Sequence, residues 1–413
     1  MNRNVYHPRA WVLALLVMAL MSSSAALPAA DAPVPVQVFH SGSEGYHTFR
    51  IPAIVRTTNG TLLAFAEGRR NDGGDTGAID LVLKRSFDNG LTWGPLQMVA
   101  AGGADTIGNP TPIVDARTSK ILLLTTHNRG NTTEAQVLSG AVRDRFVFVQ
   151  ASVDDGATWS VAKEITSTAK RPAWRYYATG PVHGIQLTRG AHAGRLVAPC
   201  NHSATNSSGA SVWGAHLLYS DDGGTTWQIG ATDTSNNRVV NPNECAAVEL
   251  SDGRIYAVAR NEEAKAPGHR VIANSPDAGL TFEAPFAIDI RLISPVVQGS
   301  VLRYSAVDQG DGANRILFSA PGDQFHRARM TIRSSSDETW SWSAGKVIYD
   351  GPSAYSDMVK LPGGLVGLLY ESGLKQPYER ITFTALSATF LDAPDPFPPA
   401  GESEREKGPG VNP

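Results

Sequence analysis

A short pattern, Ser-x-Asp-x-Gly-x-Thr-Trp, returns along the chain and constrains its fold more than any other feature. Four clear copies begin at serines, namely Ser86, Ser152, Ser220 and Ser275. The fourth copy has Phe282 in place of Trp, and a degenerate fifth copy spans residues 335–340. Asp and Gly favour a tight turn between strands, and the aromatic residue returns the chain to a core. Successive serines lie 66, 68, 55 and 60 residues apart, a repetition typical of a propeller or solenoid.

The segments between the copies predict the contents of each repeat. Three short apolar segments precede the first copy, at residues 50–55, 61–66 and 79–85. The same order recurs within residues 111–151, 183–219, 245–274, 300–333 and 357–386. Six such units predict an all-β fold, a six-bladed β-propeller of four-stranded antiparallel sheets, whose closure leaves few exposed edges. Residues 36–39 are predicted to complete the last blade, with residues 387–391 as the alternative.

The two ends of the chain differ in composition from the repeats. Arg3 and Arg9 precede an apolar run at residues 10–21 and a stretch of small residues, so residues 1–30 are predicted to be a secretory signal peptide. We therefore expect a secreted or periplasmic protein, without stable membrane insertion after cleavage. Residues 31–391 form the predicted propeller domain. Residues 392–413 are rich in Pro and charge and are predicted to be a disordered tail.

Composition excludes several classes of function. The 40 glycines and 26 prolines suit many short strands, and the net charge of -3 with no basic run argues against nucleic-acid binding.

Cys200 and Cys245 are the only cysteines, and they either form a disulfide or remain two buried thiols. No nucleotide or metal-ligand motif is present, so no cofactor is expected. We expect a monomer.

Strand direction predicts which polar residues share a face. In a run of antiparallel strands, the start of the first, the end of the second and the start of the third lie at one face. The Asp-containing turns follow the third strand and lie at the opposite face. Seven polar residues are predicted at the first face: Arg50, Arg69, Asp75, Glu244, Arg260, Arg327 and Tyr355.

The chain carries the motif Phe49-Arg50-Ile51-Pro52 followed by the repeated Ser-x-Asp-x-Gly-x-Thr-Trp pattern, whose copies are called Asp boxes. This combination resembles that of bacterial exo-α-sialidases (neuraminidases) of the BNR-repeat family. The resemblance covers roughly residues 40–390. It implies a six-bladed propeller and a glycoside hydrolase that removes terminal sialic acid from glycoproteins, glycolipids or oligosaccharides. It also implies retention through a covalent tyrosyl intermediate.

The family's functional residues can be carried over by motif. Arg50, Arg260 and Arg327 match the arginines that hold the sialic acid carboxylate, and Arg69 matches a further substrate-contacting arginine. Arg329 is the alternative to Arg327.

The catalytic residues carry over in the same way. Asp75 falls where the family has its acid/base catalyst, with Asp72 and Asp80 as nearby alternatives. Tyr355 matches the nucleophile, and Glu244 matches its partner base.

The substrate explains this choice of residues. Because sialic acid carries a carboxylate on its anomeric carbon, it would repel an anionic nucleophile, whereas a neutral phenol avoids that repulsion. Tyr355 needs a base such as Glu244 to take its proton, and the crowded arginines are expected to favour its phenolate form. Six further polar residues of this face are given no role: Asn109, Tyr177, His183, His202, Gln298 and Glu371.

Three other functions remain to be weighed. A trans-sialidase or intramolecular trans-sialidase would share the catalytic set. A non-catalytic glycan-binding propeller would keep the Asp boxes and lose the polar residues of the first face. An inverting glycosidase would use two carboxylates and no tyrosine.

Overall fold

The computed structural model describes Met1 and residues 33–206, 209–233, 239–262 and 268–397. The predicted signal peptide, apart from Met1, lies outside the described residues. The described chain is an all-β protein of antiparallel sheets. Its few helices are short, and the α-helices are α1 (Glu134–Ser139), α2 (Thr166–Ala169) and α3 (Ala388–Asp392). Among the described residues, no helix is long and apolar enough to cross a membrane.

The first half of the chain forms two successive runs of antiparallel strands. The first run is β2 (Thr48–Arg56), β3 (Leu62–Arg69), β4 (Ile79–Ser86) and β5 (Gln97–Ala100). The second is β6 (Thr106–Asp115), β7 (Lys120–Asn128), β8 (Phe146–Ser152) and β9 (Lys163–Glu164). A single parallel pairing between Ile79 and Thr106 joins the two runs.

The middle of the chain repeats the same order in two further sheets. One contains β10 (Tyr177–Thr179), β11 (Ile185–Gln186), β12 (Leu196–Thr205), β13 (Ser211–Ser220) and β14 (Gln228–Thr232). Two short strands, β10 and β11, both pair with β12 where the sequence predicted one strand at residues 183–187. The other sheet contains β15 (Pro242–Glu249), β16 (Ile255–Asn261), β17 (His269–Ser275) and β18 (Ala287–Ile293).

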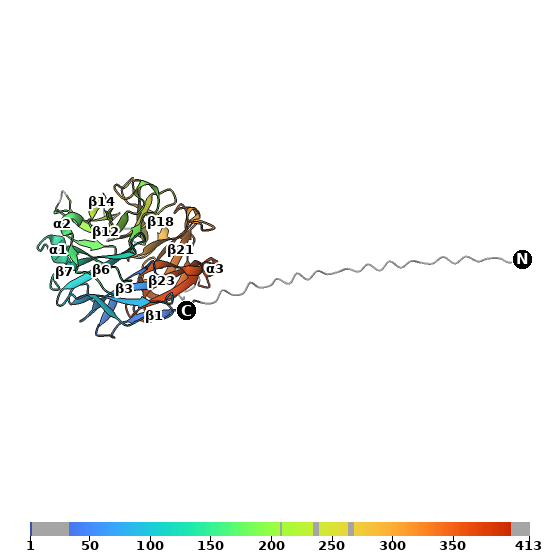
Figure 1. Cartoon of the computed structure of the whole chain (residues 1–413), viewed down its shortest axis with the longest axis horizontal. Coiled ribbons are helices and arrows are strands. Elements are labelled where there is room, and N and C mark those ends of the chain that lie inside the picture. Colours follow the sequence, from blue (N-terminus) through green and yellow to red (C-terminus); the bar gives the residue numbers. More distant parts are fainter. Residues whose placement is uncertain (2–32, 207–208, 234–238, 263–267, 398–413) are drawn as a thin grey trace, which may run out of the picture.

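The last sheet joins the end of the chain to its beginning. It contains β19 (Ser300–Ser305), β20 (Arg315–Pro321), β21 (Ala328–Ser335), β22 (Lys346–Leu361), β23 (Leu365–Ser372), β24 (Arg380–Ser387) and β1 (Val36–His40). The long strand β22 pairs with β21 through its first part and with β23 through its second. β1 pairs with β24, which confirms the predicted edge strand, and α3 occupies the alternative segment. In Figure 1 the sequence colours follow one another around the body until the red strands meet the blue ones.

Each Asp box ties its own turn together and packs against the neighbouring sheet. In the first box, Asp88 accepts hydrogen bonds from Ser86 Oγ at 2.8 Å and from the Thr92 backbone N–H at 2.9 Å. Gly90 has a φ of +93°, and a Cβ there would lie 2.0 Å from the Phe383 ring. The close approach of β24 therefore requires glycine at this turn.

The fifth Asp box is complete, which corrects the degenerate copy expected at residues 335–340. Asp337 accepts hydrogen bonds from Ser335 Oγ and from the Ser341 N–H, each at 2.9 Å. Trp342 takes the packed aromatic position, whereas Trp340 is 75% exposed. Thr339, with a φ of +74°, stands where the other boxes have glycine, and Ser341 stands where they have threonine, so two substitutions hid the pattern.

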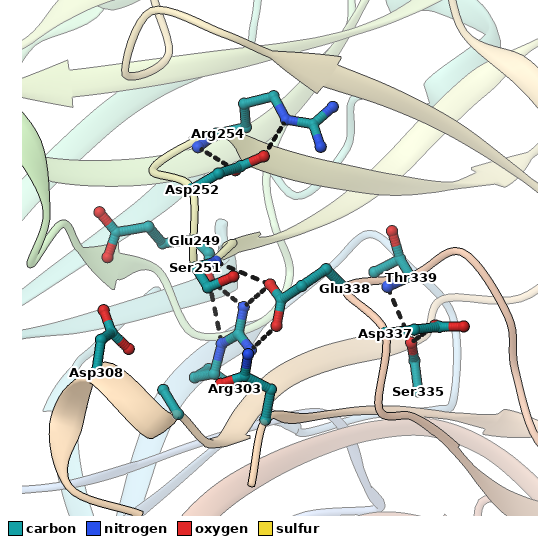
Figure 2. A network of polar contacts seen from close by, with 12 residues as sticks. Glu249, Ser251, Asp252, Arg254, Arg303, Asp308, Ser335, Asp337, Glu338 and Thr339 are labelled. Atoms are coloured by element: carbon teal, nitrogen blue, oxygen red, sulfur yellow. Dashed lines mark hydrogen bonds and ion pairs between the residues drawn. The ribbon is translucent and has the colours of Figure 1, made fainter.

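The fifth box also contacts the sheet that precedes it. Figure 2 shows the Glu338 carboxylate joined by dashed lines to Arg303 on β19 and to Ser251 after β15. Glu338 accepts hydrogen bonds from Arg303 Nη1 at 2.7 Å and from the Ser251 N–H at 2.8 Å. This turn thereby joins two sheets through charge-assisted hydrogen bonds.

Two remaining expectations concern the tail and the cysteines. Asp392 pairs with Arg315 at 2.7 Å, and Asp395 accepts a hydrogen bond from the Val347 N–H at 3.0 Å. The first residues of the predicted tail thus contact the last sheet, and residues 398–413 lie outside the described residues. Cys200 and Cys245 are both buried free thiols, not a disulfide.

Candidate active site

The seven polar residues predicted to share one face line a single cavity of about 260 Å³. They come from segments more than 300 residues apart in sequence. Further polar and aromatic side chains of the lining include Asn109, Glu134, Arg145, Tyr176, Trp213 and Glu262. The antiparallel order of the strands therefore brings the predicted residues together.

Tyr355, Glu244 and Arg260 are in mutual contact on one wall. The Tyr355 hydroxyl on β22 donates a short hydrogen bond to Glu244 Oε1 on β15. Arg260 Nη1, on β16, donates to Glu244 Oε2 at 3.0 Å and to the Tyr355 hydroxyl at 3.3 Å. A phenol is thus held directly against a carboxylate that can accept its proton.

The electrostatics of Tyr355 differ from the sequence expectation. Burial, followed by the charge of Glu244, raises the pKa of Tyr355 well above its ordinary value. The charges of Arg260, Arg327 and Arg50 act in the opposite direction and are outweighed. The arginines do favour the phenolate, as the sequence predicts, but burial and Glu244 prevail, so Tyr355 is a protonated phenol in the free protein.

Glu371 on β23 holds two site residues in place. Its carboxylate accepts hydrogen bonds from Arg50 Nε at 3.0 Å and Nη2 at 3.2 Å. It also accepts from the backbone N–H groups of Ile51 at 2.9 Å and Tyr355 at 3.1 Å. Ile51 has a φ of +60° where the register of β2 shifts, which turns Arg50 into the cavity. Glu371, which the sequence left without a role, positions both Arg50 and Tyr355.

Asp75 lies at the mouth of the cavity beside two arginines. Its carboxylate is 2.8 Å from Arg69 Nη1 and 3.8 Å from Arg50 Nη1. Burial acts to raise the pKa of Asp75, but the charges of Arg69 and Arg50 outweigh it, so the pKa lies below its ordinary value. The side chain is 73% exposed, so water screens these charges in part. Asp75 is ionised in the free protein at neutral pH.

The alternatives to Asp75 serve the local fold. Asp80 is fully buried and accepts hydrogen bonds from the Tyr46 hydroxyl at 2.8 Å and the Gly102 N–H at 2.7 Å. Asp72 accepts a hydrogen bond from the Gly74 N–H at 2.7 Å within its own turn. Neither lines the cavity.

Arg327 and Arg329 point to different partners. Arg327 lines the cavity and donates to the Tyr378 hydroxyl at 2.7 Å and to the Val296 carbonyl at 3.1 Å. Arg329 has a φ of +64° and pairs with Asp350 at 2.9 Å, outside the cavity lining. The Arg50 guanidinium also lies 4.0 Å from the centre of the Tyr378 ring. Tyr378 therefore contacts two of the cavity arginines, a role that no sequence motif indicated.

Comparison with known proteins identifies the family of the chain. Residues 60–368 match the model of the BNR repeat-like domain. An exo-alpha-sialidase from Aspergillus fumigatus is 33% identical over 353 residues, which cover 79% of both chains. A sialidase from Micromonospora viridifaciens is 33% identical over 379 residues, covering 87% of this chain and 57% of that relative. The chain belongs to the BNR-repeat sialidase family. It thus spans a little over half the length of the Micromonospora relative.

A solved structure agrees with this membership of the sialidase family. The Hadza microbial sialidase Hz136 superimposes with a TM-score of 0.74 at 25% identity. The match covers 86% of this chain and 69% of that one.

Other polar residues of the predicted face of this sialidase family member have structural partners. His183 Nδ1 and Asp357 Oδ1 are 2.6 Å apart, and the Gln298 side chain donates to the Ser356 carbonyl at 2.9 Å. Tyr177 and His202 are buried in a cluster with Trp174. Of the six residues left without a role, Asn109 alone lines the cavity.

Neither sequence motif nor repeat indicated the aromatic wall of the cavity. Tyr176 and Trp213 lie edge to face, with ring centres 5.1 Å apart. Tyr176 immediately precedes β10 and Trp213 lies on β13, and these two strands flank β12 in one sheet. Within the described parts of the chain, no group of three or more His, Cys, Asp or Glu side chains could hold a metal ion.

Proposed function

We propose that the protein is an exo-α-sialidase that hydrolyses terminal sialic acid from glycans with retention, through a covalent intermediate on Tyr355. The observation that carries this proposal is the hydrogen bond from Tyr355 to Glu244 inside a cavity lined by arginines. A neutral nucleophile beside a base, facing fixed positive charge, suits a sugar whose reacting carbon bears a carboxylate.

The arginines bind and orient the substrate in this proposal. Arg50, Arg260 and Arg327 hold the sialic acid carboxylate, because guanidinium groups pair with carboxylates through two parallel hydrogen bonds. Glu371 keeps Arg50 in position, and Tyr378 does so for Arg327. Arg69 contacts the sugar near Asp75.

Tyr355 attacks the anomeric carbon while Glu244 takes its proton. Because burial keeps the phenol protonated in the free protein, the proton moves only as the bond to carbon forms. Arg260, which contacts both oxygens, stabilises the negative charge that passes between them.

Asp75 protonates the departing glycan and then activates water. In the free protein Asp75 is ionised because Arg69 and Arg50 lower its pKa. A bound substrate brings its own carboxylate to Arg50, which offsets that positive charge and raises the pKa of Asp75. The substrate thereby helps to protonate its own acid catalyst.

The architecture that we propose around this site is a six-bladed propeller of four-stranded sheets. Its support is the pairing of β1 with β24 and the division of β22 between two sheets. The runs of strands that begin with β2, β6, β11, β15, β19 and the second part of β22 would each form one blade. We further propose that the protein is exported, on the basis of residues 1–30.

One assay tests the activity. The protein is incubated with an aryl sialoside and, in parallel, with the aryl glycoside of a neutral sugar. Release of aryl alcohol from the sialoside alone is expected, and proton NMR should detect the α-anomer of free sialic acid first. Equal cleavage of both glycosides, first release of the β-anomer, or transfer of sialic acid without hydrolysis would contradict the proposal.

A further inference from the structure

A second cavity, of about 620 Å³, adjoins the candidate active site. It lies between the segment before β8 and the loop that follows α2. Six of its lining residues matter here: Arg143, Arg145, Lys170, Arg171, Arg175 and the ring of Trp174. No Asp or Glu side chain is among the lining residues. The cavity therefore gathers five cationic side chains around one hollow.

Carboxylates of the described residues act on these five cations only without forming ion pairs: Asp75 and Glu134 are near enough to feel the charge of Arg145. None of the five side chains forms an ion pair with a described Asp or Glu; the three that donate hydrogen bonds donate to neutral groups. Lys170 Nζ donates to the Arg145 carbonyl at 2.9 Å and to the Arg175 carbonyl at 2.7 Å. Arg175 Nη1 donates to the Leu138 carbonyl at 2.7 Å, and Arg145 Nη1 to the Asn128 amide oxygen at 3.0 Å.

Asp144, the nearest acidic residue in sequence, is directed elsewhere. It is buried and accepts hydrogen bonds from the Arg129 N–H at 3.1 Å and from the Thr132 hydroxyl. Burial, followed by the charges of Arg145 and Arg143, lowers the pKa of Lys170 to about 8, although the charge of Asp144 acts in the opposite direction. Like charges held this close repel one another, so an anion bound among them would be strongly favoured.

Arg145 connects this cavity to the active site, because it lines both. Its guanidinium lies 4.3 Å from the centre of the Tyr176 ring, which forms part of the active-site wall. The charge of Arg145 also acts on Asp75 and lowers its pKa. Asp75 is the group placed beside the leaving oxygen, so the second cavity lies on the side from which the remainder of the glycan departs.

We propose that this second cavity is a subsite for an oxyanion, a carboxylate or a sulfate, carried by the leaving part of the glycan. Arg143 and Arg171 are the most exposed of the five cations and bind the anion directly. Arg145 lies at the end of the subsite nearest to Asp75. This inference rests on the proposed function. Its consequence is a preference for sialosides whose leaving sugar is itself acidic.

The first experiment compares three sialosides of the same linkage. Their leaving sugars are neutral, sulfated, or substituted with a second sialic acid. In the double variant Arg143→Gln/Arg171→Gln, KM for the two acidic substrates should rise roughly tenfold, as expected for lost hydrogen bonds to a charged group. KM for the neutral substrate should not change. A response to one acidic substrate alone identifies the anion that the subsite accepts.

Control variants separate charge from packing. Arg143→Lys/Arg171→Lys keeps the charge and should recover much of the preference. Arg85→Gln serves as a control, because Arg85 also lies over an aromatic ring, that of Phe87 in the first Asp box. This variant should leave all three KM values unchanged. Equal changes of KM for neutral and acidic substrates in the double variant, or no change for any, would overturn the subsite.

A binding measurement separates the subsite from catalysis. Sulfated lactose, which has no sialic acid to cleave, is titrated calorimetrically into the full-length protein with excess free sialic acid in the main cavity. Binding that the double variant loses supports the subsite. Absence of binding to the wild-type protein overturns it even if sialosides are hydrolysed. Binding without hydrolysis of any sialoside would instead refute the proposed enzymatic function.

Discussion

The hydroxyl of Tyr355 and the carboxylate of Glu244 share a hydrogen bond although 111 residues separate them in sequence. Their strands, β22 and β15, belong to different sheets. The contact therefore exists only in the assembled fold. It places an acceptor beside the proton that leaves the phenol as the bond to carbon forms.

Removal of the Tyr355 hydroxyl should abolish turnover. Tyr355→Phe deletes one oxygen and hardly alters packing, so kcat should fall roughly 10⁴-fold or more, as for loss of other enzymatic nucleophiles. The melting temperature, followed by circular dichroism, should stay close to wild type. A fluorinated sialic acid analogue should label Tyr355 in the wild-type protein, as peptide mass will reveal. A label on Glu244 would reverse the roles of the two residues.

Asp75→Ala should separate substrates by their leaving groups. A sugar hydroxyl needs a proton to depart, whereas an activated aryl alcohol does not. Cleavage of a natural sialoside should therefore fall far more than formation of the intermediate from an aryl sialoside, measured as the burst of aryl alcohol. Equal losses on both substrates would mean that Asp75 only positions the sugar.

The pH profile should report the charge around Asp75. Arg69 and Arg50 lower its pKa, so its protonated form is lost as pH rises through an acidic range. The limb of kcat/KM at high pH reflects the free enzyme, and that of kcat reflects the bound complex. For a natural sialoside, kcat/KM should therefore decline at a lower pH than kcat. Coinciding limbs would argue against the effect of substrate charge on Asp75.

Arg327→Ala and Arg329→Ala should differ in effect. Arg327 faces the cavity, and its loss should raise KM roughly 10- to 100-fold, the range expected for hydrogen bonds to a charged group. Arg329 pairs with half-exposed Asp350, so its loss should change stability by about 1 kcal/mol at most and leave KM unaltered. A larger rise in KM for Arg329→Ala would transfer the substrate-binding role to that residue.

Gly90→Ala should destabilise the fold without harming catalysis. The new Cβ would lie 2.0 Å from the Phe383 ring, and with the strain of positive φ the free energy of unfolding should fall by about 3 kcal/mol. Gly42→Ala is the matched control, because Gly42 has a φ of +81° and no atom within 4 Å of the new Cβ. Urea unfolding should show a loss of only about 1 kcal/mol there. Similar losses of unfolding free energy in both variants would contradict the packing of the first Asp box against Phe383.

The sequence predicted those parts of the site that short motifs mark. Arg50 and Arg260 lie near strand ends, and Tyr355 lies where β22 passes from its pairing with β21 to its pairing with β23. Strand direction brings these points to one face. The roles of Glu371 and Tyr378 were not predicted, because each acts through tertiary contacts that no local sequence pattern indicates. The effect of the arginines on the pKa of Tyr355 was predicted, but not that burial outweighs it, because this burial depends on neighbours from several strands.

The fold followed the repeat closely, and its departures have local causes. Thr339 at a glycine position and Ser341 at a threonine position hid the fifth Asp box, whose hydrogen bonds nevertheless form. The first strand of the third repeat is divided into β10 and β11. The cluster of Arg143 and Arg171 was not recognised because charge spread over a loop and a turn gives no run in sequence.

The pairing of β1 with β24 has a kinetic consequence. Val36 on β1 lies opposite Phe383 on β24. β1 is synthesised early, so it cannot form its ladder of hydrogen bonds until β24 has also been synthesised. Contacts between residues so distant in sequence form slowly, because their loop must close first. Until then both strands keep unpaired edges that can recruit other chains. The last sheet can therefore be completed only after β24 has emerged from the ribosome, and this late step is where aggregation competes with folding.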